Sequence, residues 1–301
     1  MYQPRRASRS EFLPIRNLRQ HVRTWGEPRA GEPVLVLLHG WMDVAASWQF
    51  VVDQLAHDRF IVAPDWRGFG LTEGPAVDHY VFADYLGDLD ALLDHYAPDA
   101  PVQLVGHSMG GNVAMMYAGA RPARISRLVN LEGFGMPATR PEQAPSRYAR
   151  WLDQLRDYRA GGVALRDYAN PGDVAARLLR TNPRLASDKA EWLARHWARP
   201  GPDGRWRILG DAAHKLVSAS LYRVDEALAC FRAITAPVLW VEAADSRPED
   251  WWKQSYTREE AHARLDVVPH LAKVRIPEAG HMLHHDQPAL VAQQLATFFS
   301  N

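Results

Sequence analysis

Short aliphatic runs alternate with longer segments of helical periodicity along the first half of the chain. The aliphatic runs are continuous, which is typical of strands buried on both faces of a parallel sheet. They lie at residues 34–38, 60–63, 102–105 and 125–131. The segments between them, at residues 47–56, 80–96 and 112–120, place apolar residues three and four positions apart and predict helices. This alternation predicts a doubly wound, mostly parallel α/β sheet with right-handed crossovers.

The pattern stops near residue 134 and resumes near residue 236. Residues 134–235 are rich in Arg, Trp and Tyr, contain no clear buried strand, and show helical periodicity at 146–159, 174–180 and 189–197. At the two ends of the chain we expect an antiparallel hairpin (11–15 and 20–25), two further strands (237–241 and 272–276) and a closing helix (288–299). The sequence therefore predicts a core in two parts, 1–133 and 236–301, with a helical cap at 134–235, here called the cap segment, inserted between the sixth and seventh strands.

Composition narrows the classes of partner. The 301 residues carry 35 basic and 35 acidic side chains, so no strong overall field points to nucleic acid or a membrane surface. The longest apolar runs fall far short of the ~20 residues that a membrane span needs. One cysteine, Cys230, permits no internal disulfide or thiolate cluster, and residues 1–10 lack the apolar stretch of a secretory signal. We expect a cytoplasmic protein that acts on a small molecule.

A candidate nucleophile lies between a predicted strand and a predicted helix. The run Gly106-His107-Ser108-Met109-Gly110 has the G-x-S-x-G pattern of a nucleophile elbow. Such a turn lifts the serine oxygen out of the backbone, and its glycines let the strand and the helix approach closely. The pattern occurs by chance about 0.1 times in a chain of this length. Its position after a buried strand and before a helix favours the catalytic interpretation for Ser108.

Three further motifs follow in an order that resembles the α/β-hydrolase superfamily, in particular its esterase-like serine hydrolases with a helical cap. They are His39-Gly40 after a strand, the loop Asp65-Trp66-Arg67-Gly68-Phe69-Gly70, and Gly280-His281 with Pro288 opening the last helix. The resemblance covers nearly the whole chain outside the cap segment. It implies catalysis by a serine, a histidine and a carboxylate.

The resemblance implies His281 as the general base, because it lies in the loop after the last strand. The neighbouring His284 and His285 are then loop or surface residues. For the acid, the implied position is Asp245, four residues past a strand end, in the superfamily's chain order of serine, acid and histidine. Glu132, at the end of the strand before the cap segment, is the alternative, since some relatives carry their acid there. Asp250 is a weaker third candidate.

The same resemblance implies an oxyanion hole formed by the backbone N–H groups of Trp41 and Met109. His39 is expected to support the loop that carries Trp41. We interpret Asp65 and Arg67 as structural, because an arginine–carboxylate fork commonly ties loops together.

The substrate pocket is expected beneath the cap segment, at the carboxyl ends of the strands. Three residues are candidates for its lining: His107, Trp151 and Trp192. Most aromatic side chains of the cap segment are expected instead to form its own core and its contact with the sheet.

These features predict a serine hydrolase that cleaves a carboxylic ester through an acyl-Ser108 intermediate, without metal or cofactor. The same triad also serves carbon–carbon bond hydrolases and lactonases, because fold and triad do not select the substrate. Dehalogenase and epoxide-hydrolase chemistry is disfavoured, since those relatives usually carry aspartate at the position of Ser108. A slow ligand receptor of the same fold is the alternative outside enzymes.

Overall fold

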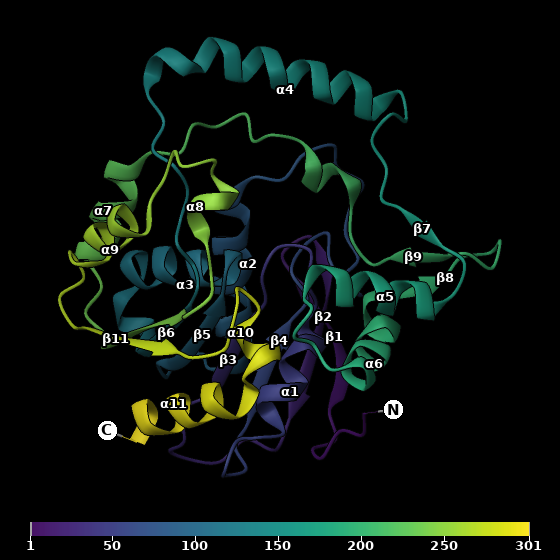
Figure 1. Ribbon diagram of the computed structural model, residues 1–301. Helices are drawn as coiled ribbons and strands as arrows, with labels where there is room; N and C mark the ends of the chain where they lie inside the picture. Colours follow the sequence, from purple (N-terminus) through teal and green to yellow (C-terminus); the bar gives the residue numbers. More distant parts are fainter. Residues whose placement is uncertain (1, 301) are drawn as a thin grey trace.

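A central sheet of eight strands organises the protein, whose computed structural model describes residues 2–300 (Figure 1). The strands are β1 (Arg9–Ile15), β2 (Leu18–Trp25), β3 (Leu35–Leu38), β4 (Ile61–Pro64), β5 (Val102–His107), β6 (Ile125–Leu131), β10 (Val238–Ala243) and β11 (Leu271–Ile276). Their order across the sheet is β1-β2-β4-β3-β5-β6-β10-β11. From β4 to β11 all neighbours are parallel, whereas the β1–β2 hairpin joins β4 in antiparallel register. The predicted sheet is confirmed.

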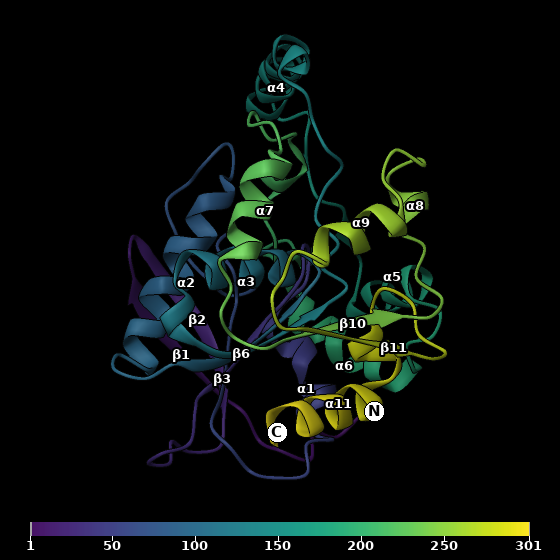
Figure 2. The same ribbon diagram turned by 90° about the vertical axis from the view of Figure 1, so that its left-hand side faces the viewer.

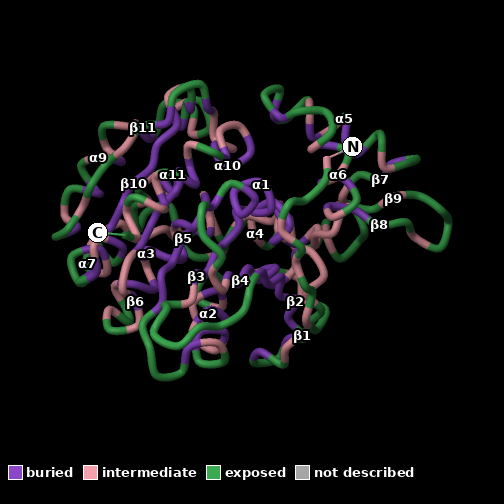
Figure 3. Tube along the Cα trace, turned by 90° about the horizontal axis from the view of Figure 1, so that it is seen from below, coloured by how far each residue is buried: buried purple, intermediate pink, exposed green. Residues whose placement is uncertain are grey.

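Successive residues of the central strands enter two different apolar cores, one on each face of the sheet. In β3, Val36 and Leu38 pack with α2 (Phe82–Tyr96) and α3 (Met109–Ala120), and Leu35 and Leu37 pack with α1 (Gln49–Val52) and α11 (Pro288–Ser300). Figure 2 shows these helices above and below the sheet, and in Figure 3 much of the trace of the central strands is coloured as buried. This double burial explains the continuous aliphatic runs. Among residues 2–300, no helix combines the length and the apolar character that crossing a membrane requires.

The chain between β6 and β10 forms helices and a second, small sheet. Its helices are α4 (Ala144–Arg159), α5 (Pro171–Thr181), α6 (Ser187–Trp197) and α7 (Val224–Arg232), and its strands are β7 (Asp167–Tyr168), β8 (Ala198–Pro200) and β9 (Trp206–Ile208). The short strands pair antiparallel in the order β7-β9-β8. Helix α4 has no fully buried residue and lies at the outer end of the molecule, away from the large sheet (Figures 1 and 2).

The structure contains short elements that the sequence did not predict, and it shortens one helix that the sequence did predict. The small sheet was not predicted, because strands of two or three residues are too short to show periodicity. The helix expected at residues 47–56 is a single turn, α1, preceded by the 3₁₀ turn Ala45–Trp48. After β10 the chain forms α8 (Pro248–Trp251) and α9 (Arg258–Leu265), and α10 (Leu283–Asp286) precedes α11.

Candidate active site

Ser108 occupies the sharp turn between β5 and α3. Its backbone has φ 51° and ψ −115°, in the positive-φ region that is costly for a residue with a side chain. Two backbone hydrogen bonds hold the turn, from Ser108 N–H to the Leu131 carbonyl (2.8 Å) and from Asn112 N–H to the Ser108 carbonyl (3.0 Å). A side chain at Gly106 would collide with the carbonyl oxygen of Gly110. The local sequence thus permits the strained turn that exposes the Ser108 hydroxyl.

The Ser108 hydroxyl, the His281 imidazole and the Glu132 carboxylate form one hydrogen-bonded line, here called the catalytic line for the role expected of it from the sequence. Ser108 Oγ lies 3.0 Å from His281 Nε2, and His281 Nδ1 lies 3.2 Å from Glu132 Oε2. Ser108 comes from the end of β5, Glu132 from the end of β6, and His281 from the loop after β11. The carboxyl ends of these parallel strands meet at one edge of the sheet. This arrangement can pass a proton from the hydroxyl to the imidazole and stabilise the resulting charge.

Glu132 is buried at the inner end of this hydrogen-bonded line, and its carboxylate accepts hydrogen bonds from two further groups. The N–H of Ala243 donates to its Oε1 (2.7 Å), and the Ser246 hydroxyl donates to its Oε2 (2.5 Å). Burial raises the pKa of Glu132 to about 8, and the hydrogen bonds from Ser246 and Ala243 act in the opposite direction. Burial lowers the pKa of His281 to about 4, so the imidazole is a neutral proton acceptor at neutral pH. Because the two groups touch, they titrate as a pair.

Asp245, the first candidate for the acid, lies elsewhere. Its carboxylate pairs with Arg184 at 2.9 Å, and both side chains are nearly half exposed. Asp250 accepts a hydrogen bond from Gln254. The structure therefore corrects the expected pairing of Asp245 with His281 and brings the alternative, Glu132, to the imidazole. The physical reason is side-chain direction: both acids follow adjacent strands, but Glu132 points into the protein and Asp245 points toward solvent and Arg184.

The loop that carries Trp41 lies directly against the elbow. A methyl group at Gly40 would stand 3.2 Å from Ser108 Cβ. The buried His39 ring accepts a hydrogen bond from Trp66 N–H at Nε2 (3.0 Å) and donates from Nδ1 to the Gly40 carbonyl (2.7 Å). That carbonyl belongs to the same planar peptide unit as the N–H of Trp41. His39 therefore orients the Trp41 N–H, while the N–H of Met109 lies at the first residue of α3.

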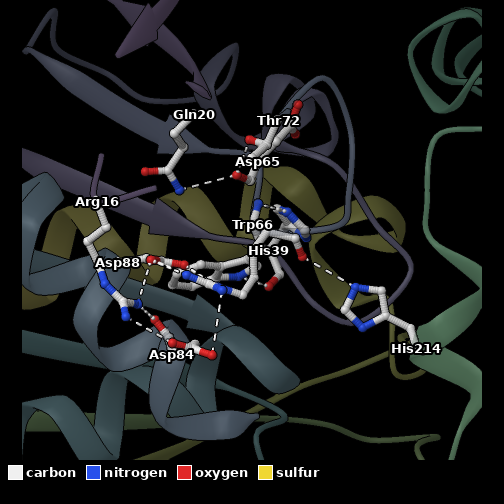
Figure 4. Close-up of polar contacts among 10 residues, drawn as sticks. Arg16, Gln20, His39, Asp65, Trp66, Thr72, Asp84, Asp88 and His214 are labelled. Carbon is white, nitrogen blue, oxygen red and sulfur yellow. Dashed lines mark hydrogen bonds and ion pairs between the residues drawn. The ribbon is translucent and has the colours of Figure 1, made fainter. Parts of the chain in front are cut away.

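Figure 4 shows how the neighbouring loop is anchored. Arg67 forms a two-pronged ion pair with the buried Asp88 on α2, through Nε (2.6 Å) and Nη2 (2.7 Å). Asp65 does not pair with Arg67: it contacts His21 Nδ1 (2.7 Å) and accepts from the backbone N–H of Ala45 (2.7 Å). Both side chains are held by protein groups outside the catalytic line, which favours the structural interpretation of this loop.

The three side chains expected to line the pocket occupy different places. His107 is buried behind His281, where its Nε2–H donates to the His281 carbonyl (2.8 Å). Trp192 joins the apolar cluster of α5 and α6 and packs edge-on against Phe50 (ring centroids 5.7 Å apart). Trp151, on α4, packs against His79 (5.9 Å). The contacts of Trp151 and Trp192 are with residues other than Ser108, His281 and Glu132, and the Trp192 ring packs in the apolar cluster of α5 and α6, whereas His107 contacts His281 directly. That these three side chains line the substrate pocket stays a prediction.

Two groups near the catalytic line were missed in the sequence. Trp251 packs its ring edge-on against the His281 imidazole (4.3 Å) and keeps 44% of its surface exposed. Ser246 reaches Glu132 across 114 positions of sequence, and no local pattern signals such a contact. The paired tryptophans at 251 and 252, in the loop after a strand, were an available but weak signal for an apolar wall.

His284 and His285 are buried, not loop or surface residues as expected. Helix α10 presses them onto α1 and the turn before it: the His284 ring lies 5.0 Å from that of Trp48, and the His285 ring lies 5.4 Å from that of Phe50. Sequence periodicity could not reveal this, because α10 is only one turn long.

The family model of the alpha/beta hydrolase fold matches residues 33–288. The chain belongs to this hydrolase family. A serine hydrolase-like protein of Danio rerio is 30% identical over 246 residues, 80% of this hydrolase and 73% of the relative. The 2-hydroxy-6-oxo-2,4-heptadienoate hydrolase of Pseudomonas putida is 37% identical over 110 residues, 36% and 39% of the two chains. Among solved structures, the thioesterase domain from the curacin biosynthetic pathway has a TM-score of 0.80 and 26% identity, with 97% and 99% of the chains covered.

Proposed function

We propose that this hydrolase cleaves carboxylic esters through an acyl-Ser108 intermediate, with His281 as general base and Glu132 as the acid of the triad. The observation that carries the proposal is the continuous line from Ser108 Oγ to His281 Nε2 (3.0 Å) and from His281 Nδ1 to Glu132 Oε2 (3.2 Å). Glu132 replaces Asp245 in this role, because Asp245 is paired with Arg184.

In the first half of the reaction, His281 Nε2 takes the hydroxyl proton as Ser108 Oγ attacks the ester carbonyl carbon. The carbonyl oxygen becomes an oxyanion, for which we assign the N–H groups of Met109 and Trp41 as donors. The carbon–oxygen bond to the alcohol then breaks, and His281 gives its proton to the departing oxygen.

In the second half, His281 takes a proton from water, and the hydroxide oxygen attacks the acyl carbon. The bond to Ser108 Oγ breaks, the proton returns to that oxygen, and the carboxylic acid leaves. In both halves the imidazolium is stabilised by Glu132.

The apolar side chains around Ser108 favour substrates with an apolar acyl or alcohol group. Trp251 covers one edge of His281 and is 44% exposed, and Trp41, next to the loop residue that touches Ser108, is 53% exposed. Tryptophan is enriched at binding surfaces, because its large ring offers much apolar contact area. We further propose that the cap segment, residues 134–235, encloses the substrate over the core formed by residues 1–133 and 236–301.

A carbon–carbon bond hydrolase is the second candidate. The partial similarity to the Pseudomonas putida 2-hydroxy-6-oxo-2,4-heptadienoate hydrolase favours it, and the same serine, histidine and carboxylate could serve that reaction. The structure of the curacin thioesterase domain adds thioesters to the acyl compounds worth testing.

A fluorophosphonate probe tests the nucleophile, and substrate panels test the reaction. We expect the probe to label the wild type and the Ser255→Ala control, whose serine is exposed and distant in sequence, but not Ser108→Ala. Without the probe, the wild type and Ser255→Ala should hydrolyse p-nitrophenyl acetate and butyrate, and Ser108→Ala should not. Absence of labelling contradicts the nucleophile. Labelling with turnover of a 2-hydroxy-6-oxo-dienoate and none of esters favours the second candidate, and labelling with no turnover of either favours a receptor.

A further inference from the structure

Three buried residues that can bind metal ions lie directly behind the catalytic line. Asp43 follows β3, His107 is the last residue of β5, and His284 is on α10. Their exposed fractions are 3%, 2% and 0%. Each can bring one nitrogen or oxygen to within 4.8 Å of those of the other two. The cluster uses neither Ser108 nor Glu132, so it is separate from the proposed triad.

The hydrogen-bond partners of these side chains leave several polar atoms unmatched. Asp43 Oδ1 accepts from Trp197 Nε1 (3.0 Å) and from the Ser47 hydroxyl, but within residues 2–300 Asp43 Oδ2 has no hydrogen-bond partner. His107 uses Nε2–H on the His281 carbonyl, and its Nδ1 is unmatched over the same residues.

In His284, both ring nitrogens lack a hydrogen bond to any group of residues 2–300. The nearest charged oxygen, Asp43 Oδ2, stands 3.6 Å from Nε2. An unsatisfied buried polar atom costs about 1–3 kcal/mol, so proteins rarely leave several together. In a neutral imidazole only one ring nitrogen has a free lone pair, so Asp43 Oδ2, His107 Nδ1 and one nitrogen of His284 can together offer three ligand atoms to a bound electron-pair acceptor.

We propose that Asp43, His107 and His284 bind one divalent transition-metal ion of the Zn²⁺ type. Two imidazole nitrogens and one carboxylate oxygen are a donor set that Zn²⁺, Co²⁺ and Cu²⁺ prefer, whereas Mg²⁺ and Ca²⁺ prefer oxygen ligands. The carboxylate neutralises half of the ion's charge inside the protein. The hydrogen bonds from Trp197 and Ser47 to Asp43 Oδ1 leave Oδ2 directed to the ion.

Metal binding at this cluster should displace His281, the proposed general base. Ligand atoms about 2.0–2.1 Å from a tetrahedral Zn²⁺ are about 3.3 Å apart, so the three side chains must close in. His107 holds the His281 carbonyl at 2.8 Å, and the two rings are 4.8 Å apart. Movement of His107 therefore shifts His281 relative to Ser108. The inference that the ion inhibits hydrolysis rests on the proposed function, whereas the inference that it binds does not.

The binding test uses the full chain, stripped with EDTA and titrated with Co²⁺, whose visible absorption reports its coordination. We expect one equivalent to bind to the wild type and to Ser108→Ala alike, and Zn²⁺ to displace it. Asp43→Asn and His284→Gln should each weaken Co²⁺ binding about tenfold or more, because each alters one of three ligands. His79→Gln, which changes an exposed histidine next to Asp78, is the matched control and should bind as the wild type does.

Absence of Co²⁺ binding to the folded wild type overturns the site and favours a neutral His284 whose Nε2–H points toward Asp43 Oδ2. Binding that survives both ligand substitutions also overturns it. If one variant fails to fold, the other decides, together with the rise in the wild-type unfolding temperature that Zn²⁺ should cause and Mg²⁺ should not.

Ester hydrolysis measured in the same titration tests the coupling to His281. We expect Zn²⁺ to inhibit the wild type and His79→Gln in step with its binding, and to inhibit Asp43→Asn only at concentrations about tenfold higher or more. Binding without inhibition overturns the coupling but leaves the site in place. A protein that binds Co²⁺ but hydrolyses no substrate contradicts the proposed function alone.

Discussion

Replacing Glu132 by glutamine should disable the base while leaving the fold in place. In the wild type, Oε1 of Glu132 accepts the Ala243 N–H (2.7 Å), and Oε2 faces both Ser246 and His281. The glutamine oxygen must keep the bond to Ala243, so its NH₂ group takes the place of Oε2. That group donates to His281 Nδ1 and stabilises the tautomer whose proton is on Nε2.

An imidazole with its proton on Nε2 cannot accept one from Ser108. The imidazolium formed during attack would also face an amide instead of a carboxylate. In serine proteases the corresponding change lowers kcat by ~10⁴, which is ~5.5 kcal/mol of transition-state stabilisation. We expect a loss of this order for Glu132→Gln. The paired substitution Asp245→Asn removes only a half-exposed ion pair with Arg184, worth up to ~1 kcal/mol, and should keep kcat within about fivefold of the wild type.

The assay is p-nitrophenyl butyrate hydrolysis under saturating substrate, with near-UV circular dichroism to verify that each variant is folded. Fluorophosphonate labelling should be slowed in Glu132→Gln in proportion to kcat, because it needs the same base. A folded Glu132→Gln protein with nearly normal kcat, alongside collapse in Asp245→Asn, would refute the reasoning and restore the original assignment of the acid.

Two further predictions concern the supports of the site. Ser246→Ala removes a hydrogen bond that lowers the pKa of Glu132 and so favours its ionised form. Because Glu132 and His281 titrate as a pair and the ionised carboxylate is the active form, the lower apparent pKa of the kcat/KM profile should move to higher pH, whereas Ser255→Ala should leave it unchanged. An unmoved apparent pKa in Ser246→Ala contradicts this role. Asp88→Ala leaves the Arg67 guanidinium buried without its main partner, which should lower the free energy of unfolding, measured in urea, by about 3–5 kcal/mol. An unchanged unfolding midpoint would show that the ion pair does not stabilise the fold.

Local sequence was sufficient for the features that depend on neighbouring residues. The aliphatic runs predicted the strands because both faces of the sheet are covered, so every side chain of β3 is buried. The elbow at Ser108 was predictable because its glycines are needed within five residues of one another. The small sheet of the cap segment was not predictable from local sequence, because its strands of two and three residues are stabilised by pairing with other segments of the chain.

The choice between two carboxylates shows what the sequence alone could not decide. Glu132 and Asp245 both follow strands of the sheet, and β6 and β10 are adjacent, so each acid was a reasonable partner for His281. Side-chain direction separates them: Ala243 and Ser246 hold Glu132 toward the imidazole, while Arg184 from the cap segment holds Asp245 outward.

The sequence by itself determined the sheet, the strained serine turn and the order of the catalytic motifs, because each depends on periodicity or on residues close along the chain. Only the tertiary structure decided which acid faces His281 and which polar side chains lie buried behind it. The contacts of Ser246 with Glu132 and of Asp43 with His284 join positions more than one hundred residues apart. Such contacts follow from how the strands and loops pack, which no local pattern records.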